Sequence, residues 1–184
     1  SSVAKNMINT FFFNMNAIKG GQSRPNDVPR HQPKKVGVLG AGMMGSGIAY
    51  SQATKGIATV LKDVSVEAAE KGKGYTAKLT QKRVDKGQMS AEKQQGILSL
   101  ITPTASAADL KGCDLIIEAV FEQRELKAMV TKEAEPMLAE GGFFASNTST
   151  LPISGLAQAS RDAKKFVGIH FFSPVDKMKL VEII

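Results

Sequence analysis

The most constraining feature of this sequence is a glycine-rich turn between an apolar stretch and a helix-like stretch. Residues 35–39 (KVGVL) have strand character and lead directly into Gly40-Ala41-Gly42-Met43-Met44-Gly45, a G-x-G-x-x-G pattern. No proline interrupts the stretch from Met43 to about Lys55, which we predict to be helical. The glycines therefore stand where a strand turns into a helix N-terminus. Gly40 permits the turn, Gly42 lets a ligand approach the backbone, and Gly45 allows close packing of helix on strand.

A second predicted strand, residues 58–62, ends on Asp63, and 63 − 40 = 23 residues separate this acid from the first glycine. An acid at about this spacing binds the ribose hydroxyls of a dinucleotide, while the helix N-terminus faces its phosphates. The alternative is a structural glycine turn beside an ordinary surface aspartate, and the strand–helix–strand context favours the dinucleotide. Asp63 would repel a 2′-phosphate and Val64 offers no cation, which favours NAD over NADP. The predicted cofactor-binding residues here are Gly40, Gly42, Met43, Met44, Gly45 and Asp63.

Composition excludes several other classes of protein. A chain of 184 residues with 42% hydrophobic residues can bury one good core, and no apolar run is long enough to cross a bilayer. The net charge of +7 comes from scattered lysines, and the densest basic stretch, residues 78–86, lacks interleaved aromatics, so we predict no nucleic-acid partner. Cys113 is the single cysteine and is interpreted as a packing residue. The two histidines are far apart in sequence, and we predict no metal site.

The N-terminal segment differs from the rest of the chain. Apolar residues at helical spacing predict an amphipathic helix over residues 1–18, without the pattern of a targeting segment. Glycines and prolines predict a linker over residues 20–33, and a catalytic role for His31 within it is not expected. We therefore expect a helix and linker at 1–33 and a separate domain at 34–184.

Strands and helices alternate along that domain. The predicted elements are a helix from Val66 to about Lys86, a helix capped by Ser90, strands at 98–102 (stopped by Pro103) and 114–120, a helix at about 124–138, and a strand at 143–146 that Gly141-Gly142 separates from this helix. This order predicts an α/β fold with a doubly wound, mainly parallel sheet of the Rossmann type. Ligands bind such sheets beyond the carboxyl ends of the strands, where polar clusters occur at 118–122, at 147–150 and from His170 onward.

His170 and Glu182 are candidates for acid–base chemistry. His170 ends an apolar strand, and Glu182 lies inside the apolar run LVEII, where a carboxylate needs a partner. A histidine held by an acid can remove a proton from an alcohol. The alternatives are a buried structural histidine and an edge-strand acid that faces water. Ser149 could bind a substrate oxygen or cap the short helix that Pro152 would begin.

Four stretches resemble the NAD-binding domain of the L-3-hydroxyacyl-CoA dehydrogenases, above all the version inside multifunctional fatty-acid oxidation enzymes. They are VGVLGAGMMGSGIAY, DLIIEAVFE, FFASNTSTLPIS and GIHFFSPVDKMKLVEII. The resemblance covers residues 35–184. It implies that His170 is the catalytic base, Glu182 its partner and Ser149 a hydroxyl near the substrate's 3-oxygen. Glu122, Lys127, Ser149 and Ser173 would contact the nicotinamide side of NAD. Lys86 falls where the family meets the nucleotide end of coenzyme A.

The sequence also departs from this family. Ser173 replaces an asparagine of the single-function dehydrogenases, and we expect altered hydrogen bonding without loss of function. Family members continue into a helical domain beyond the position of Ile184, and residues 1–33 resemble the segment that follows a hydratase domain. The resemblance implies an oligomeric parent with a thiolase subunit as a candidate partner, in the bacterial cytoplasm or alternatively the mitochondrial matrix.

The expected function is oxidation of (S)-3-hydroxyacyl-CoA by NAD in fatty-acid β-oxidation. We expect this chain by itself to bind NAD and to turn over slowly, because the residues that close the cleft would lie in the missing domain. One alternative is a different NAD-dependent hydroxy-acid dehydrogenase. The other is a non-catalytic module that binds a protein or nucleic acid through its basic surface and N-terminal helix.

Overall fold

The computed structural model describes residues 1–22, 24–29 and 31–184 and divides the chain into two compact units, Ser1–Gln32 and Pro33–Ile184. The first unit holds the predicted amphipathic helix, which is confirmed as α1 (Ser2–Met7), a π-helical segment η1 (Ile8–Asn14) and α2 (Met15–Lys19). Its phenylalanines at 11–13 are each more than half exposed. Two positions of the predicted linker, Ser23 and Arg30, lie outside the described residues.

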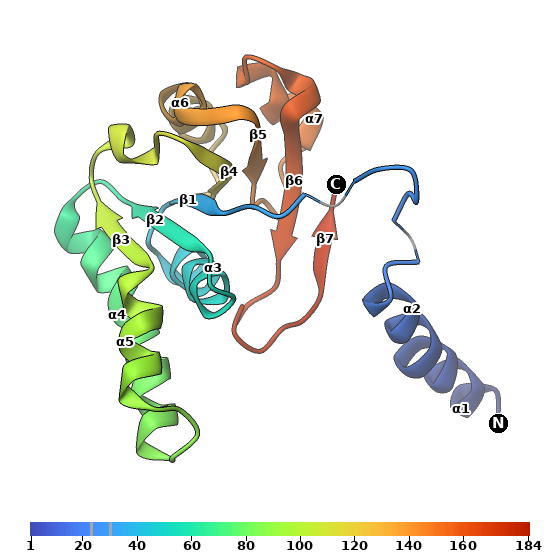
Figure 1. The fold of residues 1–184 in the computed structure, drawn as a ribbon. Helices are drawn as coiled ribbons and strands as arrows, with labels where there is room; N and C mark the ends of the chain where they lie inside the picture. The colour runs from blue at the N-terminus through green and yellow to red at the C-terminus, as the bar shows by residue number, and fades with distance from the viewer. Residues whose placement is uncertain (23, 30) are drawn as a thin grey trace. The chain divides into compact units, whose positions relative to one another are not determined.

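The second unit is built on one seven-stranded sheet with the order β3-β2-β1-β4-β5-β6-β7 (Figure 1). The strands are β1 (Lys35–Leu39), β2 (Ala58–Lys62), β3 (Ile101–Thr104), β4 (Cys113–Glu118), β5 (Leu138–Ser146), β6 (Phe166–Phe171) and β7 (Val181–Ile183). The first six pair in parallel, and β7 alone pairs antiparallel, with β6. The chain reverses its winding direction between β1 and β4, so the predicted doubly wound, mainly parallel sheet is confirmed.

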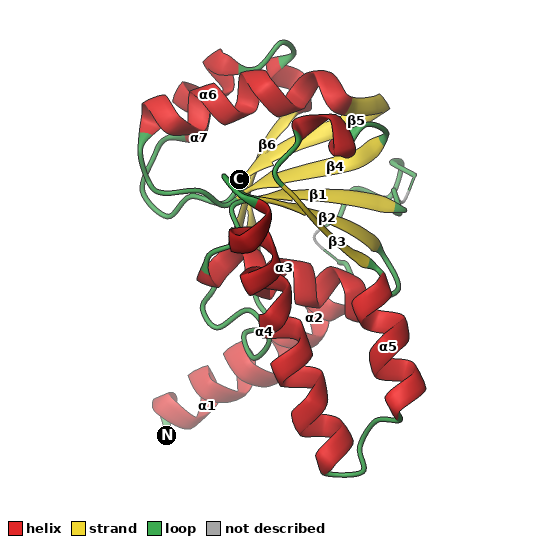
Figure 2. Cartoon of the chain, turned by 90° about the vertical axis from the view of Figure 1, so that its left-hand side faces the viewer, coloured by secondary structure: helices red, strands yellow, loops and turns green. Residues whose placement is uncertain are grey.

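Helices cover both faces of this sheet (Figure 2). One layer contains α3 (Met43–Thr54), α4 (Val66–Asp85) and α5 (Ala91–Ser99); the other contains α6 (Arg124–Ala134) and α7 (Ile153–Leu156). Short 3-10 turns occur at Ala107–Leu110, Glu135–Met137, Ala157–Ala159 and Ala163–Lys165. None of the helices in the described residues is both long and apolar enough to span a bilayer.

The core consists of two apolar clusters, one on each side of the sheet. Because successive strand residues point to opposite faces, the neighbours Ile116 and Ile117 join different clusters, and both are almost completely buried. Across β5 and β6, the rings of Phe144 and Phe166 stack with centroids 5.6 Å apart. Burial of each such side chain stabilises the fold by about 1.5–3 kcal/mol.

Serine caps and a buried glycine explain how α4 and α5 are placed. Ser65 Oγ accepts from Ala68 N at 3.1 Å and Ser90 Oγ from Lys93 N at 3.2 Å, which confirms Ser90 as the predicted N-cap. Gly72 lies inside α4, where glycine costs helix stability. A Cβ at Gly72 would lie 2.7 Å from the Cβ of Ala41, so this glycine lets α4 pack against the glycine-rich turn.

Two strand predictions are wrong. The strand predicted at 98–102 begins at Ile101 and continues through Pro103. This is tolerated because β3 is an edge strand, and one of its sides pairs with no other strand among the described residues. The strand predicted at 143–146 begins already at Leu138 and includes Gly141-Gly142. Its register against β4 shifts between Cys113 and Leu115, and Gly141 has φ = 77°, so the glycines form an irregularity within the strand and do not separate it from α6.

The glycine-rich turn predicts a contrast in stability between two substitutions. A Cβ on Gly45 would lie 1.7 Å from the carbonyl oxygen of Gly40, whereas a Cβ on Gly42 would meet nothing within 4 Å. We expect Gly45→Ala to lower the free energy of unfolding by about 2 kcal/mol and Gly42→Ala to change it by less than about 1 kcal/mol. Urea unfolding followed by circular dichroism measures both. Equal stability of the two variants would contradict the packing described here.

Candidate functional site at the carboxyl ends of the strands

The glycine-rich turn after β1 is held in a conformation that a side chain would prevent. Gly40 has φ = 89°, in the left-handed region, and its N–H donates to the carbonyl of Lys62 at 2.8 Å. Gly45 packs against the carbonyl of Gly40, as its predicted close contact requires. Gly42 is exposed and precedes the first turn of α3. The N-terminus of α3 is therefore open to a ligand at Gly42.

A cleft of about 580 Å³ adjoins this turn. Its lining includes the predicted residues Gly40, Gly42, Met43, Met44 and Asp63, and the apolar side chains of Val64, Phe121 and Met129. These three apolar residues are largely exposed, at 91%, 82% and 59%, so they form an open wall. A backbone cradle, a carboxylate and an apolar wall are the groups that bind pyrophosphate, ribose and adenine, and the lining therefore fits a dinucleotide.

Asp63 is fixed at the mouth of this cleft by two backbone donors. Its Oδ2 accepts from Ala41 N and its Oδ1 from Val64 N, each at 2.6 Å. The nearest cation in sequence, Lys62, has its ammonium 3.5 Å from the Glu133 carboxylate. Asp63 thus presents a carboxylate in the lining of the cleft, and Lys62 pairs with Glu133 instead, which agrees with the expectation of NAD.

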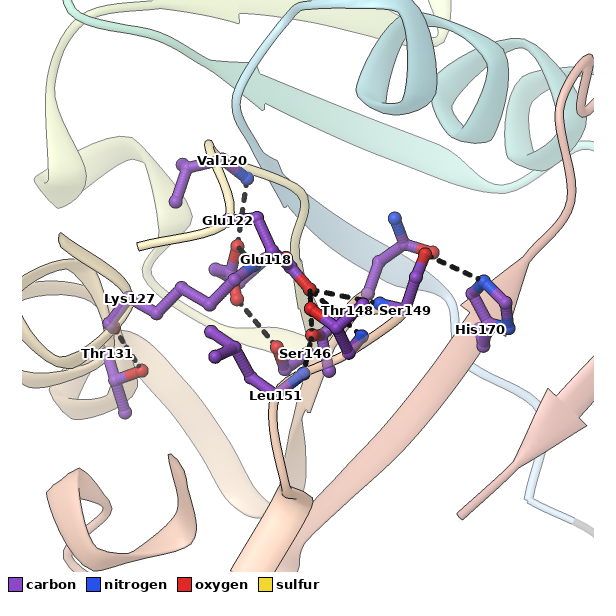
Figure 3. Close-up of polar contacts among 12 residues, drawn as sticks. Glu118, Val120, Glu122, Lys127, Thr131, Ser146, Thr148, Ser149, Leu151 and His170 are labelled. Atoms are coloured by element: carbon purple, nitrogen blue, oxygen red, sulfur yellow. Dashed lines mark hydrogen bonds and ion pairs between the residues drawn. The ribbon is translucent and has the colours of Figure 1, made fainter. Parts of the chain in front are cut away.

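His170 lies between Glu182, its predicted partner, and the hydroxyl of Ser149. Its Nδ1 is 2.7 Å from Glu182 Oε2 and its Nε2 is 3.1 Å from Ser149 Oγ. The antiparallel register pairs His170 directly with Glu182, which places both side chains on one face of β6 and β7. Figure 3 shows Ser149 directed at the imidazole. The His170 side chain is 18% exposed and the Glu182 side chain 49%.

Glu122 fixes the backbone of the segment that carries Ser149. Its Oε1 accepts from Ser149 N at 3.1 Å, from Thr150 N and Oγ1 at 3.2 Å each, and from the hydroxyl of Thr148 (Figure 3). Burial raises the pKa of this carboxyl, but the bond from Thr148, the positive charge of Lys127 and the bond from Thr150 outweigh burial and lower it to about 2. Glu122 is therefore ionised at neutral pH and anchors the Thr148–Thr150 segment.

Lys127 and Glu118 form a buried ion pair behind this segment. Lys127 Nζ lies 2.7 Å from Glu118 Oε1 and 3.3 Å from Glu122 Oε2, and the side chains of Lys127 and Glu118 are each only 1% exposed. The family resemblance implies a role for Lys127, whereas the sequence places Glu118 only within a polar cluster at a strand end. Its signal was an acid inside the apolar run LIIEAV, the same signal that drew attention to Glu182.

The remaining predicted residues lie at two different places. Ser173 Oγ donates to Met43 Sδ at 3.7 Å, which connects the loop after β6 to the glycine-rich turn. Lys86 is exposed at the C-cap of α4 and does not line the cleft beside the glycine-rich turn.

A second cleft, of about 650 Å³, lies among α3, α4, α5 and the β6–β7 loop, and Lys86 is not part of its lining either. It is lined by five cationic side chains, of which only Arg83 belongs to the basic stretch 78–86 noted in the sequence: Lys55, Arg83, Lys93, Lys177 and Lys179.

Comparison with known proteins identifies relatives of this chain. Residues 35–184 match the family described as "3-hydroxyacyl-CoA dehydrogenase, NAD binding domain". Two proteins named fatty acid oxidation complex subunit alpha are each 41% identical to the chain. The match to the protein from Colwellia psychrerythraea covers 91% of this chain and 23% of that protein. The match to the protein from Pseudomonas entomophila covers 100% and 26%. The chain thus spans about a quarter of the length of these relatives.

Solved structures agree with this match. (S)-3-hydroxybutyryl-CoA dehydrogenase from Ralstonia eutropha is 36% identical with a TM-score of 0.78, over 83% of this chain and 54% of that one. A 3-hydroxybutyryl-CoA dehydrogenase from Escherichia coli K12 is 31% identical with a TM-score of 0.79, over 83% and 32%. Together with the family match over residues 35–184, these likenesses show that the chain belongs to the family formed by the NAD-binding domain of the 3-hydroxyacyl-CoA dehydrogenases.

Proposed function

We propose that this chain supplies the NAD site and the catalytic base of an enzyme that converts (S)-3-hydroxyacyl-CoA and NAD⁺ to 3-oxoacyl-CoA, NADH and a proton. The observation that carries the proposal is the position of His170, between the carboxylate of Glu182 and the hydroxyl of Ser149. Three residues further along, Ser173 contacts Met43, which lines the dinucleotide cleft. Ser173 thus connects the strand that bears the imidazole to the cleft that the cofactor would enter.

The residues present would hold NAD at two ends. The adenosine and pyrophosphate side would be bound by Gly40, Gly42, Met43, Met44, Gly45 and Asp63. The nicotinamide side would be contacted by Glu122, Lys127, Ser149 and Ser173. Bound NAD⁺ supplies the acceptor for the hydride that leaves C3 of the substrate. Because Glu122 is anchored to the Ser149 segment, the nicotinamide side of the site and the catalytic hydroxyl are held by one rigid connection.

The acid–base work belongs to His170. An ionised carboxylate only accepts hydrogen bonds, so Glu182 keeps the proton of the imidazole on Nδ1 and leaves a lone pair on Nε2. Nε2 is then oriented to take the proton of a substrate hydroxyl, and Glu182 stabilises the imidazolium that forms. Ser149 Oγ, 3.1 Å from Nε2, would donate to the same substrate oxygen as it becomes a carbonyl.

The basic cleft supports an acyl-CoA as the substrate. Its lysines and Arg83 suit the phosphates of coenzyme A, with the exposed Lys86 one helical turn beyond Arg83. Phe171 and Val181 also line this cleft, and they are the neighbours of His170 and Glu182 in sequence. An acyl-CoA bound there would therefore extend toward the catalytic pair. Five cations suit the several phosphate charges of coenzyme A better than the single carboxylate of a small hydroxy acid, which favours the proposed substrate.

The proposed setting is a larger protein. Relatives about four times as long support the expectation that further domains, a helical one that closes the cleft and a hydratase, complete the activity. The proposal includes an oligomeric parent that assembles with a thiolase subunit. Because both relatives are bacterial, we propose a cytoplasmic setting. For the chain of 184 residues we expect NADH binding with slow turnover.

Cofactor choice is tested at Asp63. We expect Asp63→Asn to weaken NADH binding about tenfold, because a charged acceptor for the ribose hydroxyls is lost, and to leave NADPH binding no weaker than before. Isothermal titration calorimetry measures both dissociation constants. Glu70→Gln, which neutralises an exposed acid on α4, is the matched control and should bind NADH like the wild type. An unchanged NADH affinity in Asp63→Asn would exclude this role.

The base is tested at His170. We expect His170→Gln to lower kcat for 3-hydroxybutyryl-CoA by on the order of 10²–10⁴-fold, since glutamine cannot take the proton. The NADH dissociation constant should change less than about twofold, because the imidazole lies outside the adenosine side of the site. NADH formation followed by absorbance gives kcat. Wild-type turnover in His170→Gln would rule out this residue as the base.

The anchored Glu122 gives a dependence of stability on pH. Its folded-state pKa of about 2 lies below the ordinary value of 4.5, so its contribution is complete above about pH 4.5 and is lost as the pH falls toward 2. Wild type should therefore lose its stability advantage over Glu122→Gln between about pH 5 and pH 2. Urea unfolding at a series of pH values measures this difference. A constant difference across that range would mean that Glu122 is not held as an ionised acceptor.

A further inference from the structure

Glu118 is a buried carboxylate beside the residues that hold the Ser149 segment. It ends β4 with 0% exposure, and its carboxylate contacts α6, the backbone just after β4 and the end of β5. Oε1 accepts from Lys127 Nζ at 2.7 Å and from Val120 N at 2.8 Å, while Oε2 accepts from Ser146 Oγ at 2.7 Å (Figure 3). A carboxylate this deep is stable only because these donors replace water.

The contacts of Glu118 lead to the catalytic segment by two routes. Through Lys127 its charge reaches Glu122, because the ammonium lies between the two carboxylates. Through Ser146 it holds the last residue of β5, directly before the segment that bears Ser149. Both routes end on the backbone that places Ser149 Oγ 3.1 Å from His170 Nε2.

We propose that Glu118 is the positioning residue of this site: its buried charge holds Lys127 and Ser146, and through them keeps Ser149 directed at His170. The Glu118 side chain is only 1% exposed, too deep to touch the substrate or the cofactor. Its role is to make the loop between β5 and α7 rigid at the point where a hydroxyl must meet the imidazole. The effect of Glu118 on kcat rests on the proposed function, but its effect on the contact between Ser149 and His170 does not.

The main test compares two buried carboxylates. Glu118→Gln keeps size and shape but removes the charge. Glu135→Gln is the matched control, because Glu135 is also buried, at 8% exposure, and its carboxylate accepts from Ser160 and Arg161, away from the site. We expect both variants to be less stable in urea unfolding. Only Glu118→Gln should lower kcat, by about tenfold to a hundredfold, with the NADH dissociation constant within about threefold of wild type. Equal kcat values for the two variants would overturn the proposal.

A double-mutant cycle separates positioning from general destabilisation. If Glu118 acts through Ser149, then adding Glu118→Gln to Ser149→Ala should lower kcat by less than about twofold, because the hydroxyl to be positioned is already gone. Full additivity of the two substitutions would show that Glu118 does not act through Ser149.

A spectroscopic readout needs no turnover. The chain has only two histidines, so ¹⁵N spectra of the His170 ring are assigned with the help of His31→Gln. Ser149→Ala should shift the Nε2 resonance, and Glu118→Gln should shift it in the same direction while Glu135→Gln leaves it in place. If wild type binds no NADH but these shifts appear, the proposed function fails and the positioning role stands. An Nε2 resonance unmoved by Glu118→Gln refutes the positioning role.

A second variant covers the case in which Glu118→Gln does not fold. Glu118→Leu combined with Lys127→Met replaces the buried pair by apolar groups, an exchange that is often neutral for stability. We expect this double variant to fold while its Nε2 resonance remains shifted as in Ser149→Ala. A wild-type resonance in a folded double variant would overturn the proposal.

Discussion

A charge buried away from water must be compensated by nearby opposite charge and hydrogen bonds, and this requirement organises the carboxyl edge of the sheet. Glu118 and Lys127 satisfy it for each other at 2.7 Å. Because Lys127 has a second carboxylate at 3.3 Å, the same ammonium also holds Glu122 at the border between core and solvent. The ion pair is thus part of the core and also fixes the Glu122 carboxylate, which in turn holds the Ser149 segment.

The exposed part of the site depends on that support. Glu122 accepts from the backbone of Ser149 and Thr150, groups that would otherwise need water or a helix to satisfy them. The loop is thereby held in one conformation, with the Ser149 hydroxyl turned to His170. On the other side of the imidazole, pairing of β6 with β7 places Glu182 beside Nδ1. One ring nitrogen is thus held by a strand residue and the other by the anchored loop.

The glycine-rich turn follows a different physical rule, which is steric. A Cβ at Gly45 would overlap the Gly40 carbonyl, whereas one at Gly42 would occupy open space. The turn and the imidazole come from strands far apart in sequence, yet the contact between Ser173 and Met43 connects them. Parallel strands make this possible, since their carboxyl ends all reach the same edge of the sheet.

Much of the fold could be predicted from local sequence signals. The strand–helix–strand unit around Gly40, the long α4 and the N-cap at Ser90 follow from apolar periodicity, glycine positions and capping chemistry. Pro103 and Gly141 misled the prediction because both are normally strand breakers. An edge strand tolerates the proline, and an irregular register accommodates the glycine, and neither context is visible in a local window.

The sequence by itself determined which chemical groups are available and that strand ends would carry them, because residue type and periodicity are local properties of the chain. It pointed to His170, Glu182 and Ser149, whose catalytic roles remain predictions. Only the tertiary structure decided that Glu118, 28 residues before Ser146 in the chain, shares a hydrogen bond with it, and that Lys127 lies between two acids. Such contacts depend on strand order and helix packing, which bring distant residues together and which no local pattern encodes.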